Sequence, residues 1–266
     1  MFFIFSACNG GDTVHVNRLP SNPTTIKNIN PPQGYSWVNE TNNSFEFFLQ
    51  NISLKPQGSP ILDYTGNKIS NQSEHVAILD YDIGTKDLQQ CADAVIRLRA
   101  EYLYKMNMFD AIGFHFTSGD FFTWNQYKSG VRAIVDGAHV SFEKMAAPDD
   151  SRISFRKYLD AIYSYAGTIS LFKETMSVSN DDDIKPGDIL ITPGSPGHAI
   201  IIVGRAKNSQ GKSVYLLAEG YTPAQSIHII TNTANENISP WYILSTQAST
   251  TYTARYFFTQ TNIRSF

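Results

Sequence analysis

The chain has 266 residues, of which 42% are hydrophobic and 17% charged, and its formal net charge is −3 at pH 7. This length supports one substantial core, or a core with a small appendage. The slight acidity lacks the basic footprint of a nucleic-acid-binding protein, so we expect no nucleic-acid partner. No apolar run approaches the ~20 residues of a membrane-spanning helix.

The first eight residues, MFFIFSAC, form an apolar run that closes on small residues before a cysteine. They resemble the end of a bacterial lipoprotein signal with its lipobox over 5–8, although Phe5 stands where Leu is usual. The resemblance implies that 1–8 is a signal remnant and that Cys8 is lipidated. The protein would then be exported and anchored to a membrane of the cell envelope, on its periplasmic or cell-surface side. The alternative is a disordered apolar tail.

The next segment, 9–34, is rich in Asn, Gly, Pro and Thr, which predicts a linker. Residues 35–266 are therefore expected to form a single α+β domain with an N-terminal extension. Ser44 is a candidate N-cap for a short helix over 44–49. Residues 76–79 are a candidate strand.

A longer helix is expected to follow Asp87, a candidate N-cap for which Gln90 completes a capping box. Its apolar face would carry Leu88, Cys91, Val95, Leu98 and Tyr102. Residues 112–116 predict a strand, whereas the aromatic stretch 123–137 fits no single type. Apolar spacing over 155–172 predicts a second helix with a break near Gly167.

After residue 185 the pattern changes to strands. The runs 199–205 and 214–219 flank a turn-rich loop and predict an antiparallel hairpin. Further strands are expected at 227–230, 242–244 and 252–258. Because helices come early and strands late, the order predicts an α+β fold in which an antiparallel sheet carries helices on one side.

Cys91 is the first residue with a chemical role to consider. A cysteine near the N-terminus of a helix is stabilised as a thiolate by the helix dipole, and a neighbouring histidine can hold its proton. The alternative is a small buried hydrophobic residue, because Cys91 also lies on the apolar stripe of its helix.

His198 opens an apolar strand directly after Gly197, which lets another group approach the ring. If the hairpin turn centres between residues 209 and 210, His198 faces Tyr221, and Glu219 projects from the same face as His198. Glu219 would then orient the imidazole, provided that the register does not slip by one residue. Otherwise Glu219 is an exposed charge at a strand end, and Gln225 is a second candidate to orient the ring.

This order of residues resembles the papain-like cell-wall hydrolases of the NlpC and CHAP types. The shared features are a cysteine at a helix start, Pro-Gly-Asp before a strand, Gly-His opening an apolar strand, and a polar residue on the next strand. The resemblance implies a papain-like fold and an amide-cleaving activity on peptidoglycan or a related peptide, without a cofactor. It makes Cys91 the nucleophile, His198 the base and Glu219 the orienting carboxylate. Gln90, or Gln89, would donate to the oxyanion.

Two features depart from that pattern. The cysteine is preceded by Gln-Gln rather than by Asp, and the long gap from Cys91 to His198 requires an insertion. The blocks 87–104, 114–132, 185–204 and 219–230 also resemble an uncharacterised family of exported Bacteroides-type proteins. That family is known as a domain of unknown function, so it implies export and a fold but no activity.

Trp124 and Arg132 in the aromatic stretch, together with Tyr221, are candidate substrate-binding residues. The histidines show no paired spacing typical of metal ligands, so we expect no metal site. Two functions of different classes remain open at this point: a membrane-anchored cysteine hydrolase, and a non-catalytic envelope lipoprotein that binds a glycan, peptide or partner protein. A redox-sensing thiol is a weaker third, because Cys91 has no resolving cysteine if Cys8 carries lipid.

Overall fold

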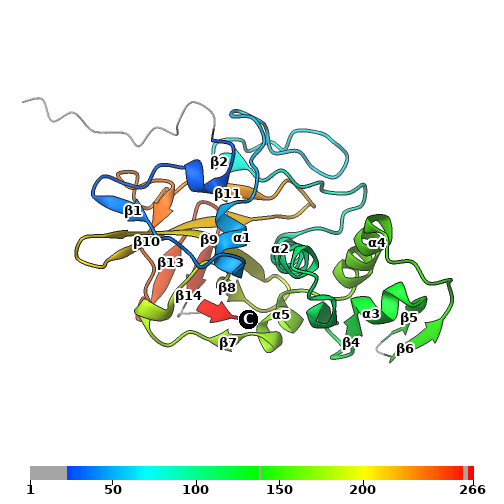
Figure 1. Ribbon diagram of the computed structural model, residues 1–266. Coiled ribbons are helices and arrows are strands. Elements are labelled where there is room, and N and C mark those ends of the chain that lie inside the picture. The colour runs from blue at the N-terminus through cyan, green and yellow to red at the C-terminus, as the bar shows by residue number, and fades with distance from the viewer. Residues whose placement is uncertain (1–22, 138, 260–262) are drawn as a thin grey trace, which may run out of the picture.

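The computed structural model describes residues 23–137, 139–259 and 263–266 (Figure 1). The expected signal remnant with Cys8 lies outside these residues. The described end of the expected linker differs from the prediction. Residues 26–28 form a 3-10 helix, η1 (Ile26–Asn28), and both Ile26 and Ile29 are fully buried in the main core. Each such side chain contributes about 1.5–3 kcal/mol, which is enough to fix a polar stretch against the domain.

A mostly antiparallel sheet forms the centre of the domain, in the path order β2-β11-β10-β9-β8-β15-β7, with β1 beside β9 and β12 beside β10. Its strands are β1 (Tyr35–Trp37), β2 (His75–Ile78), β7 (Met176–Ser177), β8 (Ile189–Thr192), β9 (His198–Asn208), β10 (Ser213–Glu219), β11 (His228–Ile230), β12 (Trp241–Tyr242) and β15 (Ile263–Ser265). The predicted hairpin is β9 and β10. The chain therefore has the expected α+β architecture.

The helices are α1 (Phe45–Gln50), α2 (Cys91–Lys105), α3 (Trp124–Lys128), α4 (Arg152–Tyr163) and α5 (Thr168–Glu174), with short 3-10 turns η2 (Phe109–Ala111) and η3 (Asp181–Asp183). Ser44 caps α1 as expected, because its hydroxyl accepts a hydrogen bond from the backbone N–H of Phe47 at 3.1 Å. The predicted break near Gly167 separates α4 from α5. None of the helices that the structure describes is long and apolar enough to cross a bilayer.

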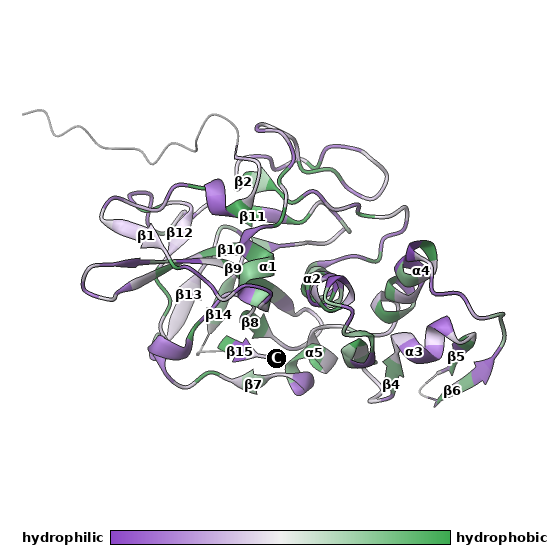
Figure 2. Cartoon of the chain, in the orientation of Figure 1, coloured by the Kyte–Doolittle hydropathy of each residue, from purple (hydrophilic) through white to green (hydrophobic). Residues whose placement is uncertain are grey.

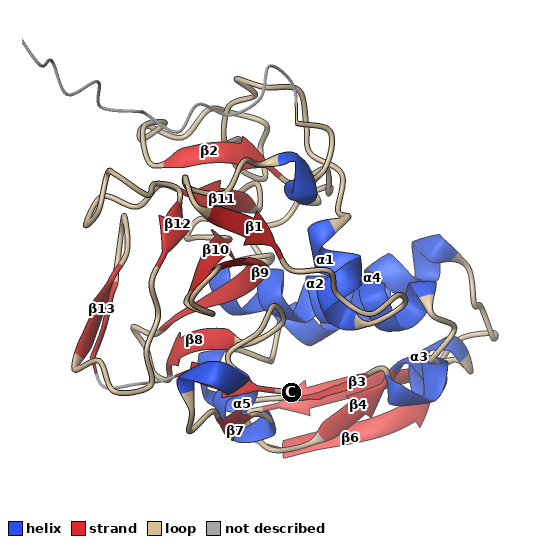
Figure 3. Cartoon of the chain, turned by 60° about the vertical axis from the view of Figure 1, so that its left-hand side comes forward, coloured by secondary structure: helices blue, strands red, loops and turns tan. Residues whose placement is uncertain are grey.

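Alternation along β9 sends its side chains to two different cores. Ile201 and Val203 join α1 and α2 in the main cluster, whereas Ile200 and Ile202 join a second cluster with Phe258 on the opposite face. Figure 2 shows the strands at this centre in the hydrophobic colour, and Figure 3 shows α1 and α2 on one side of the sheet with β13 on the other. A strand buried on both faces explains the uninterrupted apolar run of β9.

Among the described residues, three further hairpins lie outside the central sheet. They are β3 (Gly113–His115) with β4 (Phe121–Thr123), β5 (Val131–Asp136) with β6 (His139–Lys144), and β13 (Thr250–Tyr252) with β14 (Phe257–Thr259). The single strand expected over 252–258 is thus wrong: the chain turns between Tyr252 and Phe257, and the two halves pair with each other.

Residues 109–163, which we call the aromatic lobe, lie beside α2 at the right of Figure 1. The lobe packs aromatic rings against one another, with Trp124 5.3 Å from Phe155 and 5.8 Å from Tyr158 between ring centroids. It contains the stretch 123–137 that the sequence left unassigned, which forms the last residue of β4, helix α3 and strand β5. The lobe also occupies much of the long gap between Cys91 and His198.

Candidate active site at the start of helix α2

Helix α2 begins at Cys91, with Gln90 as its extended N-cap, and not directly after Asp87 as the sequence predicts. Asp87 instead accepts hydrogen bonds from Gln90 Nε2 at 3.1 Å and from the backbone N–H of Ala224 at 2.7 Å. Asp87 thus ties the segment before α2 to the segment after β10. The shift places Cys91 at the first helical position, where free backbone N–H groups and the helix dipole favour an anion.

Gly220 allows α2 to approach the end of β10. A Cβ atom at Gly220 would lie 2.8 Å from the carbonyl oxygen of Gln90 and 3.1 Å from Cβ of Ala94. Any other residue would push the helix away from the strand. Because Glu219 directly precedes Gly220, this contact fixes the first turn of α2 beside the strand that carries the carboxylate.

His198 and Glu219 form a buried pair, with 2.8 Å between Nε2 and Oε2. A carboxylate only accepts, so Nε2 holds a proton and donates it, which leaves Nδ1 of the ring for the thiol of Cys91. His198 is 3% exposed and Glu219 is 1% exposed. The His198 ring is enclosed by aromatic rings, at centroid distances of 5.2 Å from Tyr221, 4.9 Å from Tyr256 and 6.0 Å from Phe258.

The register that brings this pair together depends on a β-bulge. Near the turn, Ser213 pairs with Lys207, one residue away from the expected register. The pairing shifts by one between Leu216 and Leu217, so that Ala218 lies opposite Ile201, as the sequence predicts. The expected shared face of His198 and Glu219 is therefore confirmed, although the assumed turn geometry was wrong.

The pair has strongly displaced protonation equilibria. Burial by itself lowers the pKa of His198. Hydrogen bonds to Cys91 and Glu219, together with the charges of both, outweigh burial and raise the pKa to about 9. Burial raises the pKa of Glu219, but hydrogen bonds to His198 and His228 and their charges lower it to about 2. At neutral pH the site therefore holds an imidazolium beside a carboxylate, with the Cys91 thiol as the other polar neighbour of the ring.

A cavity of about 350 Å³ opens over Cys91. Its walls are the start of α2, the end of α4 with the turn into α5, the turn before β9, and Thr222. The lining residues are Asp87, Leu88, Gln90, Cys91, Ala92, Asp93, Tyr163, Ala166, Gly167, Thr168, Gly194, Ser195, Pro196, Gly197 and Thr222. Gly197 permits the close packing of two of these walls, because a Cβ there would lie 2.5 Å from Oγ1 of Thr168. Cys91 is partly exposed here, whereas His198 and Glu219 are buried and do not line the cavity.

The two glutamines before Cys91 have different surroundings. Gln90 lines the cavity, and its Oε1 accepts from the Thr222 hydroxyl at 3.1 Å while its Nε2 donates to Asp87. Gln89 is buried and accepts from Arg97 at 3.1 Å, so it faces away from the cavity. Gln225 is not the orienting residue: it is buried with its backbone paired to Asp63, and Glu219 holds the ring of His198.

The three expected substrate-binding residues separate into two groups. Trp124 is 1% exposed inside the aromatic lobe, so it has no face to offer a substrate. Arg132 stacks on the Tyr127 ring at 3.8 Å and donates to two carbonyl groups of the same lobe. Neither residue lines the cavity over Cys91, and the buried Trp124 is part of the core of the lobe. Tyr221 lies against His198, as the predicted register requires.

Two residues of the site were not predicted. His228 on β11 pairs with Glu219 in the sheet, and its Nε2 lies 3.6 Å from Oε1 of the carboxylate. Asp93 lines the cavity two residues after Cys91, and burial raises its pKa to about 8. A polar residue on a run as apolar as SIHII was the only signal for His228, and a strand neighbour cannot be read from sequence alone.

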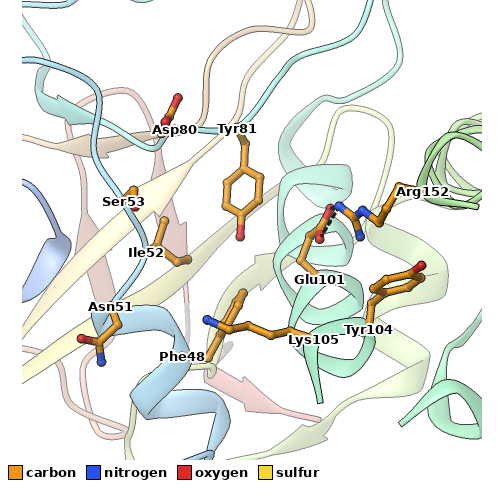
Figure 4. A pocket seen from close by; sticks show the side chains of 10 residues that line it. All are labelled: Phe48, Asn51, Ile52, Ser53, Asp80, Tyr81, Glu101, Tyr104, Lys105 and Arg152. Carbon is orange, nitrogen blue, oxygen red and sulfur yellow. Dashed lines mark hydrogen bonds and ion pairs between the residues drawn. The ribbon is translucent and has the colours of Figure 1, made fainter. Parts of the chain in front are cut away.

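A second cavity of about 370 Å³ lies farther along α2, between α1 and α4 (Figure 4). There the Glu101 carboxylate binds Arg97 and Arg152, both at 2.9 Å. This cavity contains none of Cys91, His198 and Glu219. Within the described ranges, no group of three or more His, Cys, Asp or Glu side chains is arranged to hold a metal ion.

Comparisons with known proteins give a family but no activity. A family model described as "Domain of unknown function (4846)" matches residues 26–265. No curated protein matches the chain, and no solved structure does.

Proposed function

The chain belongs to this family of unknown function, and we propose that it is a cysteine hydrolase that cleaves an amide bond. One observation carries the proposal: a partly exposed cysteine at the first position of a helix opens into a cavity and contacts a histidine that a buried carboxylate holds. These are the three roles of a nucleophile, a base and an orienting group. A papain-like arrangement, with the aromatic lobe as its insertion, is the fold relationship that fits them.

In the proposed reaction, Sγ of Cys91 attacks the amide carbonyl carbon after its proton has passed to Nδ1 of His198. His198 returns that proton to the leaving amine as the C–N bond breaks, which leaves a thioester on Cys91. Water then attacks the thioester and gives a proton to His198, so that the acid leaves and the thiolate–imidazolium pair is restored. Glu219 keeps the ring oriented and stabilises its positive charge throughout.

The oxyanion of each tetrahedral intermediate needs donors at the start of α2. The backbone N–H of Cys91 has no partner within its helix at this position. Gln90 Nε2 has a second N–H beyond the one that it gives to Asp87, and Gln90 lines the cavity. We assign both groups to the oxyanion.

The proposed substrate is a peptide, whose amide carbonyl would reach Cys91 through the cavity beside the 194–197 turn. Peptidoglycan peptides fit the proposed location in the cell envelope, where lipidated Cys8 would anchor the protein to a membrane. Tyr221 is the aromatic residue that would contact the substrate beside His198. The non-catalytic alternative predicts a buried Cys91 distant from His198, and the geometry of the site weighs against it.

The test is the alkylation rate of Cys91 as a function of pH, in the Cys8→Ser background so that a single thiol remains. A free thiol titrates near 8.5, so a rate that persists down to about pH 6 would require a thiolate stabilised by a histidine. The His198→Ala variant should lose this rate, and His139→Ala, at an exposed site on β6, should keep it. Alkylation that occurs only on unfolding would contradict the proposal.

Turnover of peptidoglycan fragments is the second measurement. Cys91→Ala should reduce it to background, a loss of at least ~10³-fold, because no other group can form the thioester. The melting temperature should change by only a few degrees. Hydrolysis that survives this substitution would exclude Cys91 as the nucleophile.

A further inference from the structure

The carboxylate of Glu219 has a histidine on each side. Its Oε2 meets Nε2 of His198 at 2.8 Å, and its Oε1 faces Nε2 of His228 at 3.6 Å. The second contact is built into the sheet, because Glu219 and His228 are direct partners in the pairing of β10 with β11. His228 is fully buried and its ring does not line the cavity over Cys91.

The proton on one nitrogen of His228 can be assigned. Nδ1 lies 2.8 Å from the carbonyl oxygen of Ser226. A carbonyl oxygen only accepts hydrogen bonds, so Nδ1 must carry a proton and donate it. Nε2 then carries a proton only if the ring is doubly protonated.

A neutral His228 would leave the buried contact unfavourable. The lone pair of Nε2 would face the negatively charged Oε1, and neither atom has another hydrogen-bond partner among the described residues. An unsatisfied buried polar group costs about 1–3 kcal/mol, and more when it is charged. A proton on Nε2 makes the same 3.6 Å contact attractive, and a small approach of the two side chains would close a charge-assisted hydrogen bond.

We infer that His228 is a positioning residue for the reaction proposed above: as an imidazolium it donates from Nε2 to Oε1 of Glu219 and holds Oε2 against His198. The inference rests on the proposed function, because it assigns His228 a role through Glu219 and not on the substrate. A carboxylate held at both oxygens cannot rotate, so Nδ1 of His198 stays directed at Cys91 through both halves of the reaction.

Charge balance supports the same protonation state. In the thiolate–imidazolium state of the proposed reaction, Cys91, His198 and Glu219 together carry a net charge of −1, and the His228 cation makes the cluster neutral. The other groups that face the pair do not supply that charge. Burial lowers the pKa of His75, whose ring lies 6.1 Å from that of His228, so His75 is neutral. Burial and the charge of Glu219 raise the pKa of Tyr242, and Arg255 is paired with Glu74 at 2.8 Å.

The experiment is an NMR titration of the histidine ring nitrogens in the full chain, in the wild type and in His228→Leu and His228→Gln. In the wild type at pH 7 both nitrogens of His228 should carry a proton. The pH at which His198 loses its proton should be near 9 in the wild type and clearly lower in His228→Leu, because a released Glu219 no longer supports the imidazolium. His228→Gln keeps a donor of similar reach and should restore most of the shift.

The direction of the shift decides the inference. If His228 acted only as a nearby positive charge, its removal would raise the pH at which His198 loses its proton. If its role were merely structural, that pH would not change. Either result overturns the inference, and so does a His228 ring that carries a single proton in the wild type. If His228→Leu does not fold, His228→Asn replaces it, since its amide is too short to reach Glu219. The NMR titration needs no substrate, so it tests the role of His228 independently of activity. An unreactive Cys91 would contradict the proposed function without deciding the result for His228. With turnover in hand, His228→Leu should lower kcat by about 10-fold or more and leave KM within twofold.

Discussion

The two cavities along α2 have similar volumes and both border buried charges, but they treat those charges differently. At the Figure 4 cavity, the Glu101 carboxylate is shared between Arg97 and Arg152, and Arg97 also binds Asp82 at 2.8 Å. At the Cys91 cavity the buried pair is His198 and Glu219, with the Cys91 thiol as the other neighbour of the imidazole ring. Permanently charged pairs hold structure, whereas a buried pair such as His198 and Glu219, whose pKa values are displaced in opposite directions, is typical of sites that transfer protons. Burial of charge by itself therefore does not identify the reactive site.

The largest effect is expected at Glu219. Glu219→Gln keeps the size of the side chain and removes its charge, so the pKa of His198 should fall from about 9 toward its ordinary value. The imidazolium is then lost at lower pH, and turnover at pH 7.5 should drop by about 10²–10⁴-fold, as for the loss of the orienting acid in other triads. The pH–rate profile of the variant checks this. Equal turnover in Glu219→Gln and the wild type would mean that the His198–Glu219 pair has only a structural role.

A smaller effect, on stability alone, is expected at the other cavity. Glu101→Gln leaves the buried Arg97 with a single carboxylate, and breaking a buried ion pair in this way costs about 3 kcal/mol. Urea unfolding should show this loss, while kcat and KM of the folded variant stay within twofold of the wild type. A loss of turnover at unchanged stability would instead assign the Figure 4 cavity a part in the reaction.

The smallest effect is expected at Asp93, where burial raises the pKa to about 8. An acid whose pKa is higher in the folded than in the unfolded state lowers the free energy of unfolding as pH rises. The loss takes place between the pKa of the unfolded state, near 3.9, and the pKa of the folded state. In the wild type, the backbone N–H of Gln90 donates to Oδ2 of Asp93 at 3.1 Å. Asp93→Asn removes the penalty, and its amide oxygen can still accept this hydrogen bond. The free energy of unfolding at pH 8, relative to pH 4, should rise by at least about 1 kcal/mol in the variant. An unchanged pH dependence would show that Asp93 is ionised in the folded protein.

Sequence patterns predicted the secondary structure best where they are strictly periodic. The Ser44 cap, the break near Gly167 and the buried Val95, Leu98 and Tyr102 of the predicted α2 stripe are confirmed, because they depend on neighbours within one or two turns. Leu88 of that stripe lies before the helix. The start of α2 was misplaced by a few residues, because Asp87 bonds to Ala224, which lies far away in the sequence. The single strand predicted over 252–258 failed for a similar reason, since its turn is stabilised by the pairing of its own halves.

Within the candidate site, the sequence identified the pair of His198 and Glu219 and the cysteine beside it. It did not identify His228, and it placed Trp124 at a binding surface although this residue is buried in the core. An aromatic residue looks the same in a sequence whether its ring stacks on a ligand or on another ring. Only the packing of the lobe distinguishes the two cases.

By itself the amino-acid sequence determined the α+β class, the order of the elements and the residue types that a nucleophile, base and orienting group require. The tertiary structure decided which of these residues meet. The shared face of His198 and Glu219 depends on one bulge, and the approach of Cys91 depends on the absence of a side chain at Gly220. The physical reason is range. Periodicity and capping act over a few residues, whereas the register joins His198 to Glu219, 21 positions away, and the close packing joins Gly220 to Gln90, which lies in another part of the chain.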